Sequence, residues 1–269
     1  MIKPAVSDIN YQIYRDISSP LRGILSIPHS GEEIPDRFYH HLTDDMAALM
    51  TDVDYQVEQL VDIPKLVSEQ IAVVVAKVHR AAVDLNRPAE QAILNWKNNS
   101  QGVELVTAEM AAQVQQEVLA SYYHPYFKVI EQLLEEFPAG SPPPIIDLHS
   151  MPSKATSYHL KLNPNQPQDR PDFCISDYLG KSCHADYIQV AIDQLTISGF
   201  RIGHNDPYQG GHITRFFSTQ KCNIIQIETN RALYMDEDKR VLHCQQVEQL
   251  RPIMTEVVGK LVCWKGSHE

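Results

Sequence analysis

The chain has 269 residues, of which 43% are hydrophobic and 21% charged, with a formal net charge of −11. This length and apolar content suit one large globular domain, so we expect a single domain over residues 1–269. The acidic balance argues against nonspecific binding to nucleic acid or to an anionic membrane surface. An anionic substrate would therefore need a local cationic pocket.

No apolar run approaches the ~18 residues of a membrane-spanning helix. The first stretch, "MIKPAVSDINYQIYRD", lacks the apolar core of a signal peptide. The five cysteines are scattered and never form a C-x-x-C pair, which is typical of reduced thiols. We therefore expect a cytoplasmic protein, and the sequence makes no prediction of its oligomeric state.

Short apolar runs rich in β-branched residues recur along the chain, and each is expected to form a strand. They are residues 23–29, 71–78, 145–149, 172–176, 200–204 and 223–228. Longer segments between them have apolar residues at helical spacing, namely 104–137, 182–199 and 239–264. We expect Ser182 to cap the second of these helices and Pro252 to break the third. The alternation predicts an α/β sandwich around a mixed, mostly parallel sheet.

Residues that can do chemistry end or follow four of these runs. In an open α/β sheet, functional groups gather at the carboxyl ends of the strands. In chain order the candidates are His29 and Glu32, then Asp84, Asn86 and Arg87, then Asp147 and His149, and lastly Glu228 and Arg231. The glycine-rich loop "NDPYQGGHITRF" (205–216), just before the last run, adds Tyr208 and Arg215.

These residue types together suit a metal-dependent hydrolase. A zinc hydrolase needs about three nitrogen or oxygen ligands and one open position, which two histidines and a carboxylate can supply. A glutamate that is not a ligand can take a proton from water and pass it to the leaving nitrogen. Arginines can bind a substrate carboxylate through two hydrogen bonds. Each residue alone also has a purely structural interpretation, but their shared position at strand ends favours a site.

Six segments of the chain show a family resemblance: "SIPHSGEEIP", "TDVDYQVEQL", "VDLNRP", "IIDLHSMP", "NDPYQGGHITRF" and "IQIETNRALYMDE". Together, in this order over residues 23–238, they resemble the N-formylglutamate amidohydrolase family. The resemblance implies a zinc-dependent hydrolase of linear amides whose usual setting is histidine degradation. It also implies a three-layer α/β sandwich similar to the fold of the zinc carboxypeptidases. One zinc ion is expected, with other divalent metals as alternatives.

The resemblance also implies roles for strand-end residues. His29 and His149 would bind the metal, and Glu228 would be the general base. Asn86 and Arg87 would bind a substrate carboxylate.

The third metal ligand has two candidates. Glu32, three residues after His29, stands at the carboxypeptidase spacing, whereas the family pattern implies the aspartates of "TDVDY". We favour Asp54 as the ligand and expect Asp52 to cap the helix that follows, where a carboxylate favours the helix dipole. Glu32 would then be a solvated loop acid.

Two further aspartates are expected to support the site. Asp147 lies two residues before His149, on the same face of a strand, where it can accept a hydrogen bond from a metal-bound histidine. Asp84 lies two residues before Asn86 in the same way. Its alternative role is that of a buried ion-pair partner that holds the loop.

The substrate of this family has two carboxylates, so one arginine would not suffice. We therefore expect Arg87, Arg215 and Arg231 to contact substrate, with Tyr208 as a hydrogen-bond donor. The alternative for Arg231 is an ion pair with Glu228 or with the acids of "MDED".

The predicted reaction is hydrolysis of N-formyl-L-glutamate to formate and L-glutamate by metal-activated water, and the expected partner is thus a small N-acyl amino acid or dicarboxylate. The loop "TRFFS" departs from the family pattern, and we expect Phe216 and Phe217 to make that wall of the pocket more apolar. One alternative is a carboxypeptidase-like zinc peptidase or another N-acyl amino acid deacylase. An alternative of another class is a non-catalytic protein that binds a metal or ligand.

Overall fold

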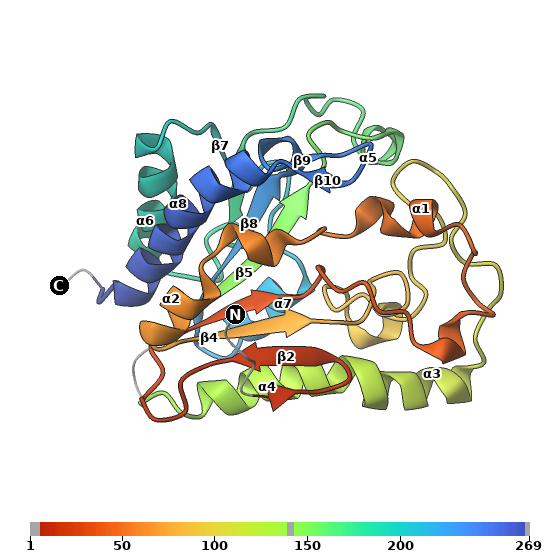
Figure 1. Ribbon diagram of the computed structural model, residues 1–269, viewed down its shortest axis with the longest axis horizontal. Coiled ribbons are helices and arrows are strands. Elements are labelled where there is room, and N and C mark those ends of the chain that lie inside the picture. Colours follow the sequence, from red (N-terminus) through yellow and green to blue (C-terminus); the bar gives the residue numbers. More distant parts are fainter. Residues whose placement is uncertain (1–5, 139–142, 267–269) are drawn as a thin grey trace.

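The computed structural model describes residues 6–138 and 143–266 (Figure 1). Within these ranges, eight strands form one sheet in the order β1-β2-β4-β3-β5-β8-β6-β7. The strands are β1 (Val6–Ser7), β2 (Tyr11–Tyr14), β3 (Gly23–Ile27), β4 (Ile71–Ala76), β5 (Pro144–Met151), β6 (Phe173–Ser176), β7 (Ile202–His204) and β8 (Asn223–Asn230). A separate hairpin pairs β9 (Met235–Asp236) with β10 (Val241–Leu242).

The centre of the sheet is parallel. β3 pairs in parallel with β4 and β5, and β5 pairs in parallel with β8. β2 and β6 join the two sides of this centre in antiparallel orientation, and β1 and β7 lie at the edges. The prediction of a mixed, mostly parallel sheet is confirmed. Because β4, β3, β5 and β8 point the same way, their carboxyl ends meet at one edge of the sheet.

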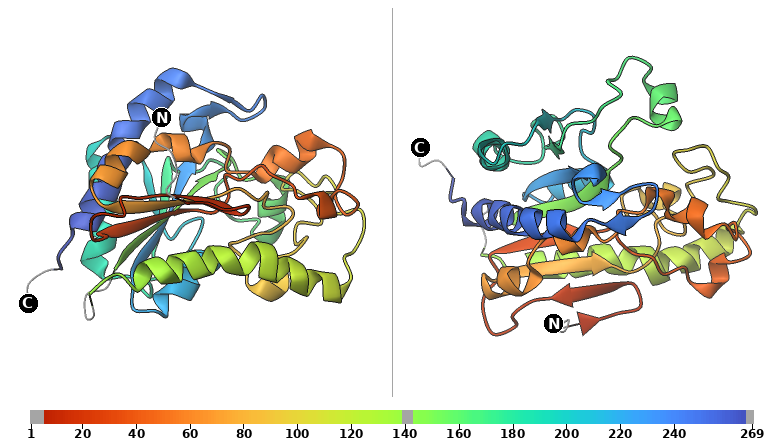
Figure 2. Two further views of the ribbon diagram at one scale, coloured as in Figure 1. Left: turned by 60° about the horizontal axis from the view of Figure 1, so that its bottom comes forward. Right: turned by 45° about the horizontal axis from the view of Figure 1, so that its top comes forward.

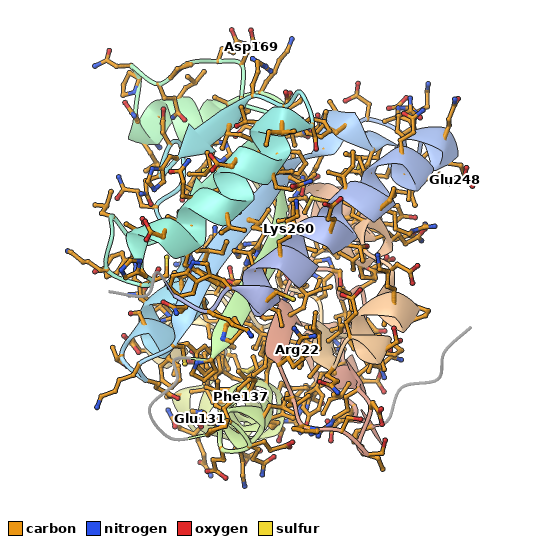
Figure 3. All side chains as sticks on the ribbon, turned by 90° about the vertical axis from the view of Figure 1, so that its left-hand side faces the viewer. Arg22, Glu131, Phe137, Asp169, Glu248 and Lys260 are labelled. Carbon is orange, nitrogen blue, oxygen red and sulfur yellow. The ribbon has the colours of Figure 1, made fainter. Side chains whose placement is uncertain are left out.

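Helices cover both faces of the sheet and complete three layers (Figure 2). Buried residues of α3, α4 and α7 pack on one face, and those of α2, α6 and α8 pack on the other. Figure 3 shows α6 and α8 side by side. Lys260 marks α8 in this view, and Glu131 marks α4, which lies apart from these two helices. The helices are α1 (Met46–Leu49), α2 (Ile63–Ser68), α3 (Ala112–Val118), α4 (His124–Leu134), α5 (Ser157–Leu162), α6 (Ala185–Ile197), α7 (His212–Ser218) and α8 (Cys244–Cys263).

Short helical turns connect these elements. A π-helical turn, Leu119–Tyr123, joins α3 to α4, so the predicted helical segment 104–137 contains two helices. The 3₁₀ turns are Asp36–Phe38, Met50–Asp52, Val57–Leu60, Ala89–Gln91 and Arg231–Leu233. In the described part of the chain, no helix is both long and apolar enough to cross a membrane.

The central strands have apolar residues on both faces. In β8, Ile224 belongs to the core beside α4, whereas Ile225 and Ile227 belong to the core beside α8. A strand covered on both faces has a nearly continuous apolar sequence, and this is why these runs could be recognised.

Two helix predictions are wrong in detail. Pro252 lies inside α8 and does not break it. Leu250 and Met254, on either side of it, are buried in the core, and this packing holds the helix together across the missing N–H. Helix α6 is capped by His184 and not by Ser182, whose hydroxyl instead donates to the carbonyl of Ile224. The hairpin of β1 and β2 was not predicted, because its strands are too short to show a pattern.

Candidate metal centre and active site

Two histidines and an aspartate converge at the carboxyl edge of the sheet. His29 follows β3, His149 lies on β5, and Asp54 lies in the loop after the turn Met50–Asp52. One ligand atom from each lies within 4.8 Å of the others, and all three residues are buried. Asp54 Oδ2 is 3.8 Å from His29 Nδ1 and 3.1 Å from His149 Nδ1. The backbone N–H of Asp54 donates to the carbonyl of His29 at 3.0 Å, which ties the loop to the strand end.

Each histidine turns its other ring nitrogen to a buried aspartate. His29 Nε2 lies 2.8 Å from Asp84 Oδ1, and His149 Nε2 lies 3.0 Å from Asp147 Oδ2. A carboxylate on the far nitrogen fixes the tautomer whose near nitrogen can bind a metal. His29 Nδ1 is buried without a hydrogen-bond partner among the described residues. His29 Nδ1, His149 Nδ1 and Asp54 Oδ2 together fit a metal bound by two histidines and one carboxylate.

Asp84 combines the two roles expected of it. Besides its contact with His29, it accepts hydrogen bonds from Trp96 Nε1 at 2.6 Å and from Arg80 Nη2 at 3.3 Å. The backbone N–H of Asn86 donates to it at 2.9 Å. The carboxylate therefore orients His29 and also holds the loop that follows β4.

Hydrogen bonds to one carboxylate oxygen of Asp54, Oδ1, fix the orientation of this side chain. Its Oδ1 accepts from Arg231 Nη2 and from Ser150 Oγ, each at 3.2 Å. Oδ2 is thereby turned toward the two histidine rings, in the position of a metal ligand.

The other acids considered as ligands or caps lie elsewhere. Glu32 is exposed and does not belong to the group formed by the described residues. Asp52 is buried, and its carboxylate accepts from the backbone N–H of Ser100 at 2.8 Å. The turn Val57–Leu60 begins after Gln56 without a side-chain cap, so the prediction that Asp52 caps a helix is wrong.

The two histidines have opposite electrostatic settings. Burial and the nearby Arg80 lower the pKa of His29 to about 4, so its ring is neutral at pH 7. Burial also acts to lower the pKa of His149, but Asp147 and Asp54 hold it well above its ordinary value. The pKa of Asp54 is lowered although burial would raise it, because both histidines and Arg80 favour its charged form. A metal would find one ring ready to bind and would displace a proton from the other.

Glu228 stands beside this group on the neighbouring strand. Glu228 lies opposite His149 in the register of β5 and β8, and only 8% of Glu228 is exposed. Gln226 Nε2 donates to its Oε1 at 2.8 Å. Burial raises the pKa of Glu228 to about 7, against the attraction of His149. A carboxyl group with this pKa can both accept and return a proton near neutral pH.

A cavity of about 580 Å³ lies over the group and includes His29, Asp54, His149 and Glu228 in its walls. The predicted substrate-binding residues line the same cavity: Asn86, Arg87, Tyr208, Arg215 and Arg231. The structure thus brings the predicted centre and the predicted substrate residues together in one place.

Asn86 joins two walls of the cavity. Its Oδ1 accepts from the backbone N–H of Ile213, at the start of α7, at 2.9 Å. A Cβ atom at Gly211 would lie 2.1 Å from Asn86 Nδ2, so this close approach requires glycine.

Two of the three predicted arginines remain accessible to a substrate. Arg87 has a side chain that is 42% exposed, and its Nε is 3.9 Å from Asp84 Oδ2. Arg215 is exposed, with its Cζ 4.9 Å from the ring centroid of Tyr178. Both are long cations at the cavity wall of an acidic protein.

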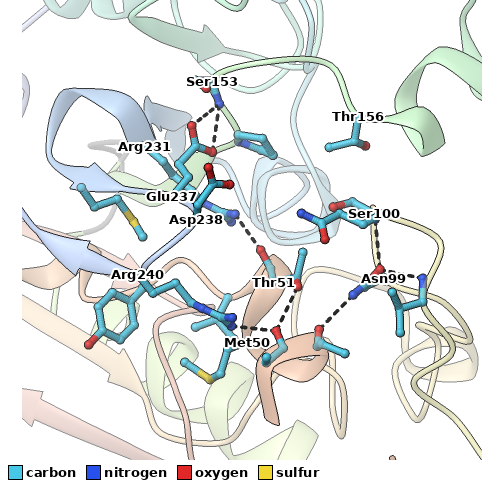
Figure 4. Close-up of a pocket in the computed structure, with 18 of the residues that line it drawn as sticks. Met50, Thr51, Asn99, Ser100, Ser153, Thr156, Arg231, Glu237, Asp238 and Arg240 are labelled. Carbon is cyan, nitrogen blue, oxygen red and sulfur yellow. Dashed lines mark hydrogen bonds between the residues drawn. The ribbon is translucent and has the colours of Figure 1, made fainter. Parts of the chain in front are cut away.

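Arg231 is instead committed to the protein itself. Besides Asp54, its guanidinium donates to Ser150 Oγ at 3.0 Å and to the carbonyl of Thr51 at 2.9 Å. Arg231 and Arg240 also line a neighbouring pocket of about 680 Å³. Figure 4 shows both side chains in this pocket. The ion pair of Arg231 is with Asp54, and neither Glu228 nor the acids of "MDED" take that place.

The expected apolar wall is wrong. Phe217 is fully buried and stacks on Phe127 of α4, with ring centroids 6.1 Å apart. Phe216 packs edge-on against the same ring at 5.1 Å. Both side chains extend the core next to α4, and neither lines the cavity.

Two residues of the cavity wall, Arg80 and His159, are absent from the sequence predictions. Arg80 is held between Asp84 and the ring of Trp96, whose centroid is 4.8 Å from its Cζ. The position of Arg80, four residues before Asp84, could have predicted the ion pair between them. His159, on α5, has no ligand spacing in the sequence, which is typical of a surface or core histidine, yet it lines the cavity beside Tyr208. The pattern T-x-x-H at the start of α5 was the only hint of its position.

Comparison with known families bears on this centre. A family model of N-formylglutamate amidohydrolase matches residues 21–235. The chain belongs to this family. It is therefore an amidohydrolase by family, which confirms the resemblance seen in the sequence. Comparison with curated protein sequences gives no match.

Solved structures agree on the fold. The N-formylglutamate amidohydrolase from Ralstonia eutropha JMP134 is similar with a TM-score of 0.80 and 21% identity, over 94% of this chain and 97% of that one. A gene product of Agrobacterium tumefaciens is similar with a TM-score of 0.70 and 15% identity, over 94% of this chain and 95% of that one. The same α/β architecture thus extends over nearly the whole chain.

Proposed function

We propose that this protein is a zinc-dependent hydrolase that cleaves N-formyl-L-glutamate to formate and L-glutamate. The observation that supports this most is the buried group of His29, Asp54 and His149, with Glu228 beside it in a cavity that arginines also line. Membership of the amidohydrolase family makes hydrolysis of an amide bond the chemistry to expect of such a group.

The metal would be held by His29 Nδ1, Asp54 Oδ2 and His149 Nδ1. Two nitrogens and one carboxylate oxygen with an open fourth position are typical of catalytic zinc, and other divalent metals are alternatives. When bound, the metal supplies a Lewis acid that polarises the amide carbonyl and makes water a better nucleophile. Asp84 and Asp147 keep the two rings in the orientation that this requires.

Glu228 is the proposed general base. It takes a proton from the attacking water as the carbon–oxygen bond forms, and it gives this proton to the amide nitrogen as the carbon–nitrogen bond breaks. The products are formate and the free amine of glutamate. Because Glu228 is buried, its pKa lies near the working pH and both transfers are accessible.

Arg80 is the cation proposed to stabilise charge on the carbonyl oxygen. Its side chain lines the cavity, and the carbonyl of Asp52 and the carboxylate of Asp84 hold it in place. A donor that is oriented before the reaction needs no reorganisation when negative charge develops.

The two substrate carboxylates are assigned to Arg87 and Arg215, with Asn86 and Tyr208 as further polar contacts. Arg231 is assigned to Asp54, because its hydrogen bonds are already made within the protein. Two accessible arginines suit a dicarboxylate better than a peptide with a single terminal carboxylate.

Formate release by the zinc-reconstituted protein tests the proposal. We expect release from N-formyl-L-glutamate, little from N-acetyl-L-glutamate, and none from chelated protein. Preference for the acetyl compound or for short peptides would indicate another deacylase or a peptidase. Turnover of none of these by protein that holds one zinc per chain would contradict the proposed function.

A further inference from the structure

His159 of α5 and Tyr208 of the loop after β7 meet at the wall of the cavity. Tyr208 Oη lies 3.2 Å from His159 Nε2. Both residues are half-buried and both line the cavity that contains Glu228. The direction of the hydrogen bond between them depends on which ring nitrogen of His159 has the proton.

The surroundings of His159 assign this proton. The backbone N–H of Thr156 lies 3.2 Å from Nδ1 and can only donate, so Nδ1 must offer its lone pair. This contact is one half of a capping box at the start of α5, in which the Thr156 hydroxyl oxygen accepts from the backbone N–H of His159. The same hydroxyl lies 2.7 Å from Nδ1. A neutral ring with an acceptor at Nδ1 has its proton on Nε2, directed at Tyr208.

The ring is neutral at physiological pH. Burial and the cation of Arg170 lower the pKa of His159 to about 4, while Asp52 acts in the opposite direction and Arg231 in the same one. Arg170 is itself 3% exposed, and its Nε and Nη2 have no acceptor in the described part of the chain. Its Cζ lies 5.4 Å from the ring centroid of Tyr208.

The bond from His159 leaves the phenolic proton of Tyr208 uncommitted. The hydroxyl oxygen accepts from Nε2–H, so its own O–H can donate to a group in the cavity. If the atom at the position of Nε2 were a hydrogen-bond acceptor, the O–H of Tyr208 would donate to it and not to a group in the cavity. His159 thus decides whether Tyr208 is a donor or an acceptor toward the substrate.

We propose that His159 is a positioning residue for substrate recognition, which holds Tyr208 so that its phenolic proton donates to a carboxylate of the substrate. The proposal rests on the proposed function for the identity of that carboxylate. Its geometric part, the Nε2–H bond to Tyr208, stands without it.

Two substitutions at the same position separate this role from helix capping. His159→Glu keeps the acceptor that a capping box uses, but its carboxylate would take the proton of Tyr208. His159→Gln supplies both an acceptor for Thr156 and an N–H donor for Tyr208. We expect His159→Glu to raise KM for N-formyl-L-glutamate roughly tenfold or more, the size of one hydrogen bond to a charged group. His159→Gln should recover most of this loss, with kcat changing less than KM in both.

The double variant with Tyr208→Phe is the decisive control. Without the phenol, His159→Glu should have little further effect on KM, because the two residues act as a unit. Lys161→Gln, an equal change of charge on the exposed side of α5, should leave KM unchanged. Equal losses in the presence and absence of the phenol, or no recovery by His159→Gln, would overturn the proposal.

Nitrogen-15 NMR of histidine-labelled protein tests the geometry without substrate, with His159→Gln used to assign the signal. We expect a neutral ring protonated at Nε2 near pH 7. Protonation at Nδ1 would overturn the proposal even if the enzyme is active. If N-formyl-L-glutamate is not hydrolysed, the proposed function fails, and this spectrum alone still decides whether His159 donates to Tyr208.

Discussion

The candidate metal centre and the rim of the cavity are built in contrasting ways. His29, His149 and Glu228 lie on or next to central strands, are buried, and are oriented by hydrogen bonds. Arg87 and Arg215 lie on loops or at a short helix and remain partly or fully exposed. The sheet therefore fixes the geometry of the proposed catalytic groups, whereas loops and a short helix present the residues proposed to bind the substrate. Changes in the two regions should affect different measured quantities.

The largest contrast is expected between the two candidate ligands. Asp54→Asn removes the only carboxylate of the group that the described residues form, so bound zinc should fall from one per chain to nearly none after dialysis. Glu32→Gln changes an exposed acid and should leave the zinc content unchanged. Loss of zinc in Glu32→Gln and not in Asp54→Asn would reverse the assignment.

The aspartates behind the histidines should have the next largest effect. Asp84→Asn and Asp147→Asn remove a carboxylate that orients a ligand ring, and each is expected to weaken zinc affinity by about 10- to 100-fold. Competition with a chromogenic chelator measures this affinity. Arg215→Gln, at the rim, serves as the control and should bind zinc as tightly as the unaltered protein. Unchanged affinity in both aspartate variants would show that the sheet alone orients the rings.

The rim should control substrate choice. Arg215→Gln is expected to raise KM for N-formyl-L-glutamate by about tenfold, the low end for a hydrogen bond to a charge because this arginine is exposed. If Arg215 binds the side-chain carboxylate, KM for N-formyl-L-alanine should hardly change. Arg87→Gln, at the other accessible arginine, should raise KM for both compounds. Equal effects of Arg215→Gln on both substrates would contradict the assignment.

The smallest expected effect is the change in zinc affinity over one pH unit. The pKa of His149 lies well above its ordinary value in the metal-free protein, so zinc must displace its proton at pH 7. His29, with a pKa of about 4, is already deprotonated there. Apparent affinity should therefore rise with pH, by up to tenfold per unit around neutrality, with about one proton released. Calorimetry in buffers of different ionisation enthalpy counts that proton, and an affinity independent of pH would contradict the electrostatic difference between the rings.

Much of the central region could be predicted from the sequence. Buried parallel strands form continuous apolar runs. Candidate site residues at the ends of these strands, such as His29 and His149, can be found from the runs alone. Asp147 follows from its spacing to His149. The hairpin of β1 and β2 could not be recognised, because runs of two to four residues show no period.

The rim could not be predicted in the same way, because its contacts join distant segments. Arg231 is adjacent to strand β8, yet its partners Thr51 and Asp54 are far from it in sequence. Phe217 stacks on Phe127 of another helix, so the departure "TRFFS" from the family pattern affects the core and not the cavity wall. His159 contacts Tyr208 only because α5 is folded over the cavity.

In the proposed mechanism, His29, Asp54 and His149 hold the metal while Glu228 performs the proton transfers. The most direct test measures zinc content and formate release together in Glu228→Gln, an isosteric change that keeps a polar partner for Gln226. We expect one zinc per chain with release slowed by at least about 100-fold, the lower range for a general acid–base. Formate release at the unaltered rate by the zinc-loaded variant would contradict the proposed role of Glu228 as general base.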